Sequence, residues 1–338
     1  MQTQHFTTTE EDLQRAADLL LAGELVAIPT ETVYGLAADA RNGKAVSDIF
    51  KAKGRPSDNP LIVHIADMTQ LSALVLDIPT HATALAEAYW PGPLTMIFRK
   101  TAAVPDEVSA GLDTVAVRMP SHPIARQLIA LSCPLAAPSA NRSGIPSPTD
   151  AVRVAEDMDG RIAAIVDGGV CEFGVESTVV DVTGECVRVL RPGAVTVPML
   201  EAVVGTVEVD EAVLRPLENG KIAASPGMKY KHYAPSAKVV LVKGSPLAYA
   251  TYVNAHSGEG VVALCFDGEE DALNVPYLTY GARDDYKAQA HRVFEALRRL
   301  DEQHATVAYT ACPLPEGIGL AVYNRLLRAA GFEVIDLD

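Results

Sequence analysis

The chain has 338 residues, of which 49% are apolar, and it carries a formal net charge of −15. This length exceeds that of a typical single domain, so two domains are expected, and the apolar fraction excludes a disordered chain. The acidic excess extends through both halves, since residues 1–205 hold 15 Lys and Arg against 25 Asp and Glu. Such a surface disfavours tight binding of a nucleic-acid backbone, which requires clustered cations, but it permits small anions in a cleft.

Cysteine usage and hydropathy indicate an intracellular protein. The five cysteines are scattered without a CxxC spacing, which fits reduced thiols and argues against a disulfide framework or a zinc site. The amino-terminal sequence MQTQHFTTTEEDLQ is too polar for a signal peptide. The sequence has no apolar run of about 18 residues, the length that a membrane-spanning helix needs. We therefore expect a cytoplasmic protein without a membrane span.

Helices and short buried strands alternate along residues 1–205. The first helix is expected at 7–23, where threonines and early acids precede apolar residues spaced by three and four, ending at Gly23. Further helices are expected at 42–54, 122–131 and 149–158. Strands are expected at 24–30, 59–66, 94–100, 114–119, 134–139, 162–169, 177–182 and 186–193. The pattern predicts a mixed α/β domain over residues 1–205 but does not determine its strand order.

Residues 206–235 interrupt this pattern and are interpreted as a linker. An acidic piece is followed by a basic, proline-bearing segment, with five cations and one acid between Arg215 and Lys238. Beyond it, strongly periodic helices alternate with apolar strands, the helices at 286–303 and 317–331 and the strands at 237–244, 260–268, 305–311 and 332–338. This alternation predicts a small parallel, Rossmann-like sheet over residues 236–338. Because GxGxxG is absent, no dinucleotide is expected there.

The sequence contains no P-loop, HExxH, GxSxG or kinase signature, so any nucleotide chemistry needs another cradle. PTETVYGLAADA (29–40) places hydroxyls and Glu31 directly after a strand, where α/β folds bind ligands, although a polar strand-to-helix turn explains the same pattern. KAKGRPSDNPLIVHI (51–65) carries Lys53 and Arg55 beside a glycine and a proline. This suits a polyphosphate, although a solvated helix end explains the same cations. His64, between apolar residues, by itself favours a core histidine.

Three later stretches carry similar groups. SAGLDTVAVRMP (109–120) ends a strand with Arg118, which is either a carboxylate clamp or a surface cation. APSANRSGIPSPT (138–149) offers hydroxyls and an amide for phosphate oxygens or a hydrated metal ion, or is an ordinary loop. Residues 167–193 supply glycines for close approach, with Ser177 and Arg191 at strand ends. Cations, hydroxyls and glycines without a nucleophile–base pair indicate catalysis by positioning and by charge neutralisation of a phosphate.

One ordered set of motifs covers roughly residues 10–200: PTETVYGL, KGRP with NPL, TVAVRMP, PSANRSG, SPT, ESTVVD and LRPG. In this order they resemble the YrdC-type threonylcarbamoyl-AMP synthase family, and SPGMKYKHYAP (225–235) resembles the linker of its two-domain branch. The resemblance implies a YrdC-like, twisted mixed α/β catalytic domain with an open cleft, followed by the small Rossmann-like domain. It also implies synthesis of threonylcarbamoyl-AMP and pyrophosphate from L-threonine, bicarbonate and ATP, for threonylcarbamoyl-adenosine modification of tRNA.

The same resemblance implies the ligand contacts, while no catalytic residue is assigned. L-Threonine is expected to contact Thr32, His64, Arg118, Ser139 and Ser177, with Arg118 on its carboxylate. ATP is expected to contact Lys53, Arg55, Asn59, Thr114, Asn141, Thr149, Arg191 and Tyr233. Chemistry on ATP implies magnesium as well. A downstream tRNA-modifying transferase is the implied partner, and tight direct binding of tRNA is not expected.

Residues 225–235 have the composition of a basic linker or of a lid. An open cleft would expose a mixed anhydride to water, so we expect this segment to fold over ATP. Pro226 and Gly227 would then set its turn, and Lys229 and Lys231 would add positive charge.

Two other functions compete with this one. The first is an RNA-binding module of the same fold, which the charge count disfavours. The second is a carbamoyl-adenylate former like that of hydrogenase-maturation proteins, which normally carries acylphosphatase and zinc-finger regions that this sequence lacks.

Overall fold

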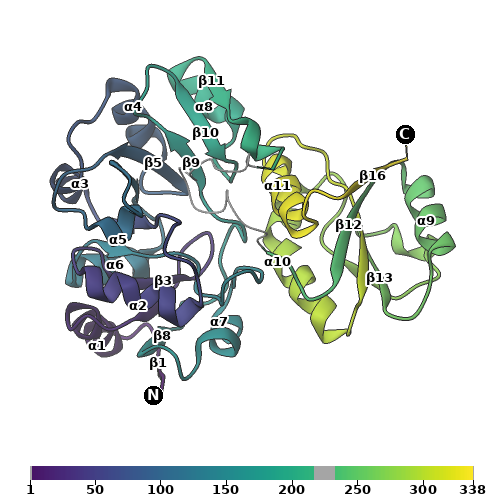
Figure 1. Ribbon diagram of the computed structural model, residues 1–338, viewed down its shortest axis with the longest axis horizontal. Helices are drawn as coiled ribbons and strands as arrows, with labels where there is room; N and C mark the ends of the chain where they lie inside the picture. The colour runs from purple at the N-terminus through teal and green to yellow at the C-terminus, as the bar shows by residue number, and fades with distance from the viewer. Residues whose placement is uncertain (1, 217–232, 338) are drawn as a thin grey trace. The chain divides into compact units, whose positions relative to one another are not determined.

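The computed structural model describes residues 2–216 and 233–337. They form two compact units (Figure 1). The first unit comprises residues 2–143 and 147–213, and the second comprises 144–146, 214–216 and 233–337. Each unit is described by itself below.

The first unit alternates strands with helices along the chain. Its elements are β1 (Gln4–Phe6), α1 (Glu10–Leu21), β2 (Val26–Ile28), β3 (Gly35–Asp39), α2 (Gly43–Lys53), β4 (Ile62–His64), α3 (Met68–Leu74), α4 (Thr80–Tyr89), β5 (Leu94–Arg99), α5 (Asp106–Ser109), β6 (Thr114–Arg118), α6 (Pro123–Leu131), β7 (Leu135–Ala136), α7 (Ala151–Met158), β8 (Ala164–Val166), β9 (Thr178–Asp181), β10 (Val187–Arg191), α8 (Val197–Val204), β11 (Val207–Val209) and the 3-10 helix η1 (Glu211–Val213).

Capping residues mark the bounds of α1 and α2, two helices that the sequence predicts. Thr9 precedes α1 and accepts a hydrogen bond from the Asp12 backbone N–H. Asn42 precedes α2, and Gly54 ends it in the left-handed region at φ 62°. A residue without a Cβ enters that region at little cost, which makes glycine the usual residue after a helix. Both helices therefore begin and end close to the predicted bounds.

The strands of the first unit form one eleven-stranded sheet in the order β1-β8-β2-β3-β7-β4-β6-β5-β9-β10-β11. It is a mixed sheet, since β4 pairs with β6 in parallel and β5 pairs with β6 antiparallel. The mixed α/β fold is confirmed. Residues 29–34 join β2 to β3, with Ile28 opposite Gly35. They therefore lead into a strand, and the alternative of a strand-to-helix turn is wrong.

Alternating side chains divide the core between the two faces of the sheet. Val26 and Ile28 lie in one apolar cluster with residues of α1 and α6, whereas Ala27 lies in a second cluster with residues of α2. Farther along the sheet, β4, β6, β5, β9 and β10 contribute to a third, smaller cluster that includes Ile62 and Ala116. Residues two apart on a strand share a face, so Arg118 projects from the same face as Ala116.

The second unit is a parallel α/β sandwich. Its elements are β12 (Lys238–Lys243), α9 (Pro246–Ala255), β13 (Val261–Cys265), the 3-10 helix η2 (Glu270–Ala272), β14 (Tyr277–Thr279), α10 (Tyr286–Glu302), β15 (Val307–Ala311), α11 (Gly319–Ala329) and β16 (Val334–Asp336). The five strands pair in parallel in the order β14-β13-β15-β12-β16. Helices α10 and α11 pack together on one face, with α9 on the other (Figure 1). The predicted Rossmann-like parallel sheet is confirmed.

Across the described residues of both units, no helix combines the length and hydrophobicity required to cross a membrane.

Candidate active site

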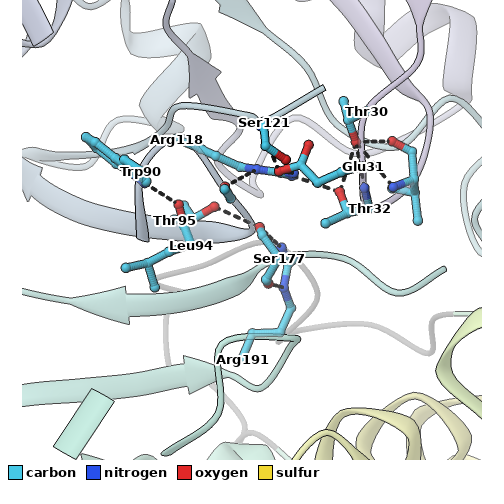
Figure 2. Close-up of polar contacts among 12 residues, drawn as sticks. Thr30, Glu31, Thr32, Trp90, Leu94, Thr95, Arg118, Ser121, Ser177 and Arg191 are labelled. Atoms are coloured by element: carbon cyan, nitrogen blue, oxygen red, sulfur yellow. Dashed lines mark hydrogen bonds and ion pairs between the residues drawn. The ribbon is translucent and has the colours of Figure 1, made fainter. Parts of the chain in front are cut away.

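Arg118, at the end of β6, lies at the centre of a buried polar cluster (Figure 2). Its Nη1 donates to Thr32 Oγ1 at 2.8 Å, and its Nε donates to the Gly92 carbonyl at 3.3 Å. Nη2 lies 2.7 Å from Glu31 Oε1 in an ion pair whose side chains are only 4% and 3% exposed. Two opposite charges therefore lie side by side, away from water.

The turn between β2 and β3 brings Glu31 to this arginine. Glu31 Oε1 also accepts the Ser121 backbone N–H at 3.0 Å, and the Glu31 carbonyl accepts the Phe173 N–H at 2.8 Å. Burial alone would raise the pKa of Glu31, but the Arg118 charge and the hydrogen bonds outweigh it and hold the pKa below its ordinary value. Glu31 is therefore a carboxylate at neutral pH.

His64 lies beside Arg118 in the sheet, because the two residues are partners in the parallel β4–β6 register. Burial, with the Arg118 charge adding to it, lowers the pKa of His64 to about 3. The imidazole is therefore neutral at physiological pH. Its buried Nδ1 has no hydrogen-bond partner among the residues that the structure describes. His64 is therefore buried, as expected of a core histidine, and it also lies next to the polar cluster around Arg118.

Ser177 and Arg191 extend the cluster across the sheet (Figure 2). Ser177 Oγ lies 2.8 Å from Thr95 Oγ1, and Arg191 donates to Ser177 Oγ at 3.2 Å and to the Ser177 carbonyl at 3.0 Å. Thr95 is the partner of Arg118 in the β5–β6 pair. The β9–β10 register shifts between Val189 and Arg191, and a bulge of this kind redirects the side chains that follow it.

A second group gathers around Lys53, at the end of α2. The buried Nζ of Lys53 donates to the Asn141 carbonyl at 2.7 Å and to the Ser139 carbonyl. Burial, with the Arg55 charge adding to it, holds the pKa of Lys53 well below its usual value. Arg55 donates to the Asn59 carbonyl at 3.3 Å. The Asn59 side-chain amide is buried, and neither of its polar atoms has a partner within the described ranges.

Tyr34 connects the β2–β3 turn to two other loops through hydrogen bonds. Its carbonyl accepts the Ala140 N–H at 2.8 Å, in the loop that carries Ser139 and Asn141. Its hydroxyl donates to the Gly169 carbonyl at 2.7 Å and accepts the Gly168 N–H at 3.1 Å. The turn that carries Glu31 and Thr32 is thereby held against two loops from distant parts of the chain.

The remaining predicted residues lie outside these contacts. Thr114 begins β6, four residues before Arg118, or about 13 Å along the strand at about 3.3 Å per residue. Thr149 accepts the Cys171 N–H at 2.8 Å through its carbonyl, just before α7. Tyr233 lies in the second unit, where its ring centroid is 5.0 Å from that of Phe294. Pro226, Gly227, Lys229 and Lys231, and with them most of the expected lid, lie outside the described residues.

The ligand contacts expected from the sequence did not include Glu31, Thr95 or His122. Glu31 had a visible signal, because it is the one acid within PTETVYGL. Thr95 had none, since a threonine inside LTMIFRK fits any strand. His122 lies just beyond the motif 109–120, and only the residues that surround it in space connect it to the site.

Family models cover most of the chain. Residues 18–193 match Sua5_yciO_yrdC (Telomere recombination), and residues 195–331 match Sua5_C (Threonylcarbamoyl-AMP synthase, C-terminal domain). The Threonylcarbamoyl-AMP synthase of Bacillus subtilis (strain 168) is 45% identical over 98% of this chain and 97% of its own length. The chain belongs to the threonylcarbamoyl-AMP synthase family.

A relative from Pyrococcus abyssi and a solved structure from the same organism agree with this assignment. The Threonylcarbamoyl-AMP synthase of Pyrococcus abyssi (strain GE5 / Orsay) is 46% identical over 96% of both chains. The crystal structure of P. abyssi Sua5 complexed with L-threonine superimposes with a TM-score of 0.92, at 42% identity over 100% of both chains. The resemblance read from the ordered motifs is therefore confirmed, for the second unit as well as for the first.

Gly193, the last residue of LRPG, yields a first testable prediction. A Cβ at this position would lie 2.4 Å from the Thr178 nitrogen and 2.8 Å from the Glu176 carbonyl oxygen, so backbone would have to move. Gly193→Ala is expected to lower the free energy of unfolding by about 1–3 kcal/mol. The measurement is denaturant unfolding followed by the fluorescence of Trp90, the single tryptophan, which lies in the first unit.

Gly184→Ala is the matched control, because the nearest atom to a Cβ there is the Cys186 carbonyl oxygen at 3.8 Å. Equal unfolding midpoints for the two variants would contradict the close approach at Gly193.

Proposed function

We propose that this protein is an L-threonylcarbamoyladenylate synthase, a nucleotidyltransferase that forms threonylcarbamoyl-AMP and pyrophosphate from L-threonine, bicarbonate and ATP. The observation that carries the proposal is the buried Arg118–Glu31 pair, with Thr32 on one side and Ser177 and Arg191 close by. Relatives named Threonylcarbamoyl-AMP synthase match the chain along nearly its whole length, and a structure of one with L-threonine supports an amino-acid site.

Threonine binds, in this proposal, at the Arg118 end of the site. Arg118 takes the α-carboxylate, because a guanidinium can donate two parallel hydrogen bonds to it. Hydroxyl groups surround the rest of the amino acid together with the neutral His64 imidazole. The full set of proposed contacts is Thr32, His64, Arg118, Ser139 and Ser177.

ATP binds, in the same proposal, alongside the amino acid. The residues of the first unit assigned to it are Lys53, Arg55, Asn59, Thr114, Asn141, Thr149 and Arg191. Arg191 donates to Ser177, so an ATP residue and a threonine residue are in direct contact, as a site that joins the two substrates requires. The carbamate oxygen attacks the α-phosphorus, the bond to pyrophosphate breaks, and the cations neutralise the departing charge.

Magnesium, in our proposal, accompanies ATP. In residues 2–216 and 233–337 no group of three or more His, Cys, Asp or Glu is placed to hold a metal ion. Magnesium is commonly bound through substrate phosphates and water, and such binding needs few protein carboxylates. The arrangement of residues therefore fits a metal carried by the nucleotide and does not fit a dedicated protein cage. Among the described residues, the groups proposed to neutralise charge are Lys53, Arg55 and Arg191.

The product is a reactive mixed anhydride that serves threonylcarbamoyl-adenosine modification of tRNA. A transferase that accepts the threonylcarbamoyl group is therefore the proposed downstream partner. The acidic balance of the first domain argues against this protein holding the tRNA tightly itself.

A substrate-omission assay tests the proposed function. Purified protein with ATP, L-threonine, bicarbonate and magnesium is expected to release pyrophosphate, and omission of threonine is expected to abolish that release. The adenylate product is identified by mass spectrometry. Release that ignores threonine but responds to carbamoyl phosphate would overturn the proposal in favour of a carbamoyl-adenylate former.

Arg55→Ala tests the nucleotide half of the site. We expect it to lower the threonine-dependent rate by at least about 100-fold, the order of effect seen when a charge-stabilising group is removed. Thermal unfolding should stay within a few degrees of the parent protein, because Arg55 is only half-buried and residues 54 and 56–58 around it are exposed. Arg126→Ala, at an exposed position on α6, is the control. An unchanged rate in Arg55→Ala would remove this residue from the site.

A further inference from the structure

One oxygen of the buried Glu31 carboxylate is left without a partner. Oε1 accepts the Ser121 N–H and lies 2.7 Å from Arg118 Nη2 in the ion pair, whereas Oε2 is buried and has no hydrogen-bond partner among the described residues. Buried polar atoms are almost always hydrogen-bonded, because an unpaired one costs about 1–3 kcal/mol, and more if it is charged. An anionic oxygen in this position is best satisfied by a cationic donor.

The positive charge of Arg118 restricts which cationic group can donate to Glu31 Oε2. Arg118 and Glu31 place a positive and a negative group 2.7 Å apart, with Thr32 on the arginine (Figure 2). An α-amino acid carries its carboxylate and its ammonium on the same carbon. A zwitterion can therefore lie against the pair, with its carboxylate toward Arg118 and its ammonium toward Glu31.

His122 lies beside the turn that carries Glu31. A Cβ on Gly168 would come within 2.5 Å of the Pro29 ring and 3.2 Å of the His122 ring, so these three residues meet at one point. Pro29 is two residues before Glu31, and His122 directly follows Ser121, whose N–H binds Glu31. The imidazole is half-buried, and its Nδ1 is buried without a partner in the described part of the chain.

The environment of His122 keeps it able to accept a proton. Burial lowers the pKa of His122, and the Glu31 charge and the Gly168 backbone offset this only in part. The imidazole is therefore neutral near pH 7. Glu31 is the charged group that acts on it, and this carboxylate stabilises an imidazolium once one has formed.

We infer that Glu31 binds the α-ammonium of the amino-acid substrate, and that His122 accepts the proton which this ammonium gives up when the carbamate forms. The inference rests on the proposed function, which supplies the amino acid and bicarbonate.

Carbamate formation removes two protons from the substrate nitrogen. The ammonium loses a proton to the His122 imidazole, and the freed lone pair forms the N–C bond to bicarbonate. The C–OH bond breaks, and the hydroxyl leaves as water with a second proton from the nitrogen. The imidazolium then returns its proton to solvent. The amine thereby becomes nucleophilic at a pH at which free threonine is mostly ammonium.

Glu31→Gln tests the ammonium contact, because it keeps the shape of the side chain and removes the charge. Calorimetry compares L-threonine with 2,3-dihydroxybutyrate, in which a hydroxyl replaces the ammonium. The parent protein should prefer threonine by about 100-fold or more, since an unpaired buried charge is costly. In Glu31→Gln this preference should fall below about tenfold, through weaker threonine binding with retained binding of the hydroxy acid. Glu24→Gln, at an exposed glutamate, is the control.

The possible outcomes distinguish a contact between Glu31 and the substrate ammonium from a merely structural role of Glu31. Equal loss of both ligands in Glu31→Gln would mean that Glu31 only positions Arg118 and would overturn the inference, as would a retained preference. Failure of the parent protein to bind threonine or to release threonine-dependent pyrophosphate would instead overturn the proposed function.

His122→Gln tests the proton transfer. Its threonine affinity should stay within about threefold of the parent, while the threonine-dependent rate at pH 7 falls by about 100-fold, the lower end of general-base effects. The deficit should shrink below about tenfold at pH 9, where more of the threonine is already free amine. His81→Gln is the control, on α4 and bonded to the Val182 carbonyl. A deficit that stays constant with pH, or no deficit at pH 7, would overturn the role of His122.

Discussion

The buried Arg118–Glu31 pair is the interaction on which the site depends. Removing two charges from water is costly, and their attraction compensates only when geometry and additional hydrogen bonds are favourable. Here Thr32 and the Gly92 carbonyl accept from the arginine, and the Ser121 N–H donates to the carboxylate. The pair therefore requires the β2–β3 turn, the residues before β5 and the residues after β6 to be in place together. Those three segments are widely separated in the sequence.

The sheet meets this requirement through its mixture of strand directions. Thr95 is opposite Arg118 in the antiparallel β5–β6 pair and opposite Val179 in the parallel β5–β9 pair, while His64 is opposite Arg118 in β4. The carboxyl ends of β4 and β6 therefore share an edge with the amino ends of β5 and β9. The bulge before Arg191 then aims a further cation at Ser177 on that edge. Polar side chains from five parts of the chain are thereby assembled at one edge of the sheet.

The chemistry that this arrangement supports is positioning with charge neutralisation. The polar groups lie in a site largely withdrawn from water, where they interact more strongly than on a surface. A site that binds several anions contains an acid because the amino acid also carries an ammonium. Glu31 then provides the single negative charge that the substrate needs, and the neutral imidazoles of His64 and His122 add no charge that would repel it.

The sequence by itself determined many of the secondary-structure elements and the parallel sheet of the second unit. The Asn42 cap and Gly54 delimit α2 through local backbone energetics, and the strand–helix alternation beyond residue 236 dictates a parallel sheet because parallel strands need crossover connections. The ordered motifs also contain Thr32, which accepts a hydrogen bond from Arg118, and Ser177 and Arg191, which contact each other.

Only the tertiary structure decided which of those residues meet. Strand order, the return of residues 29–34 into β3, and the contacts of Thr95 and His122 depend on pairing between distant segments, which short-range periodicity does not encode. The unpaired oxygen of Glu31 has the same origin. A buried atom without a partner is recognised only when every neighbour in space is known, because hydrogen bonding is satisfied in three dimensions and not along the chain.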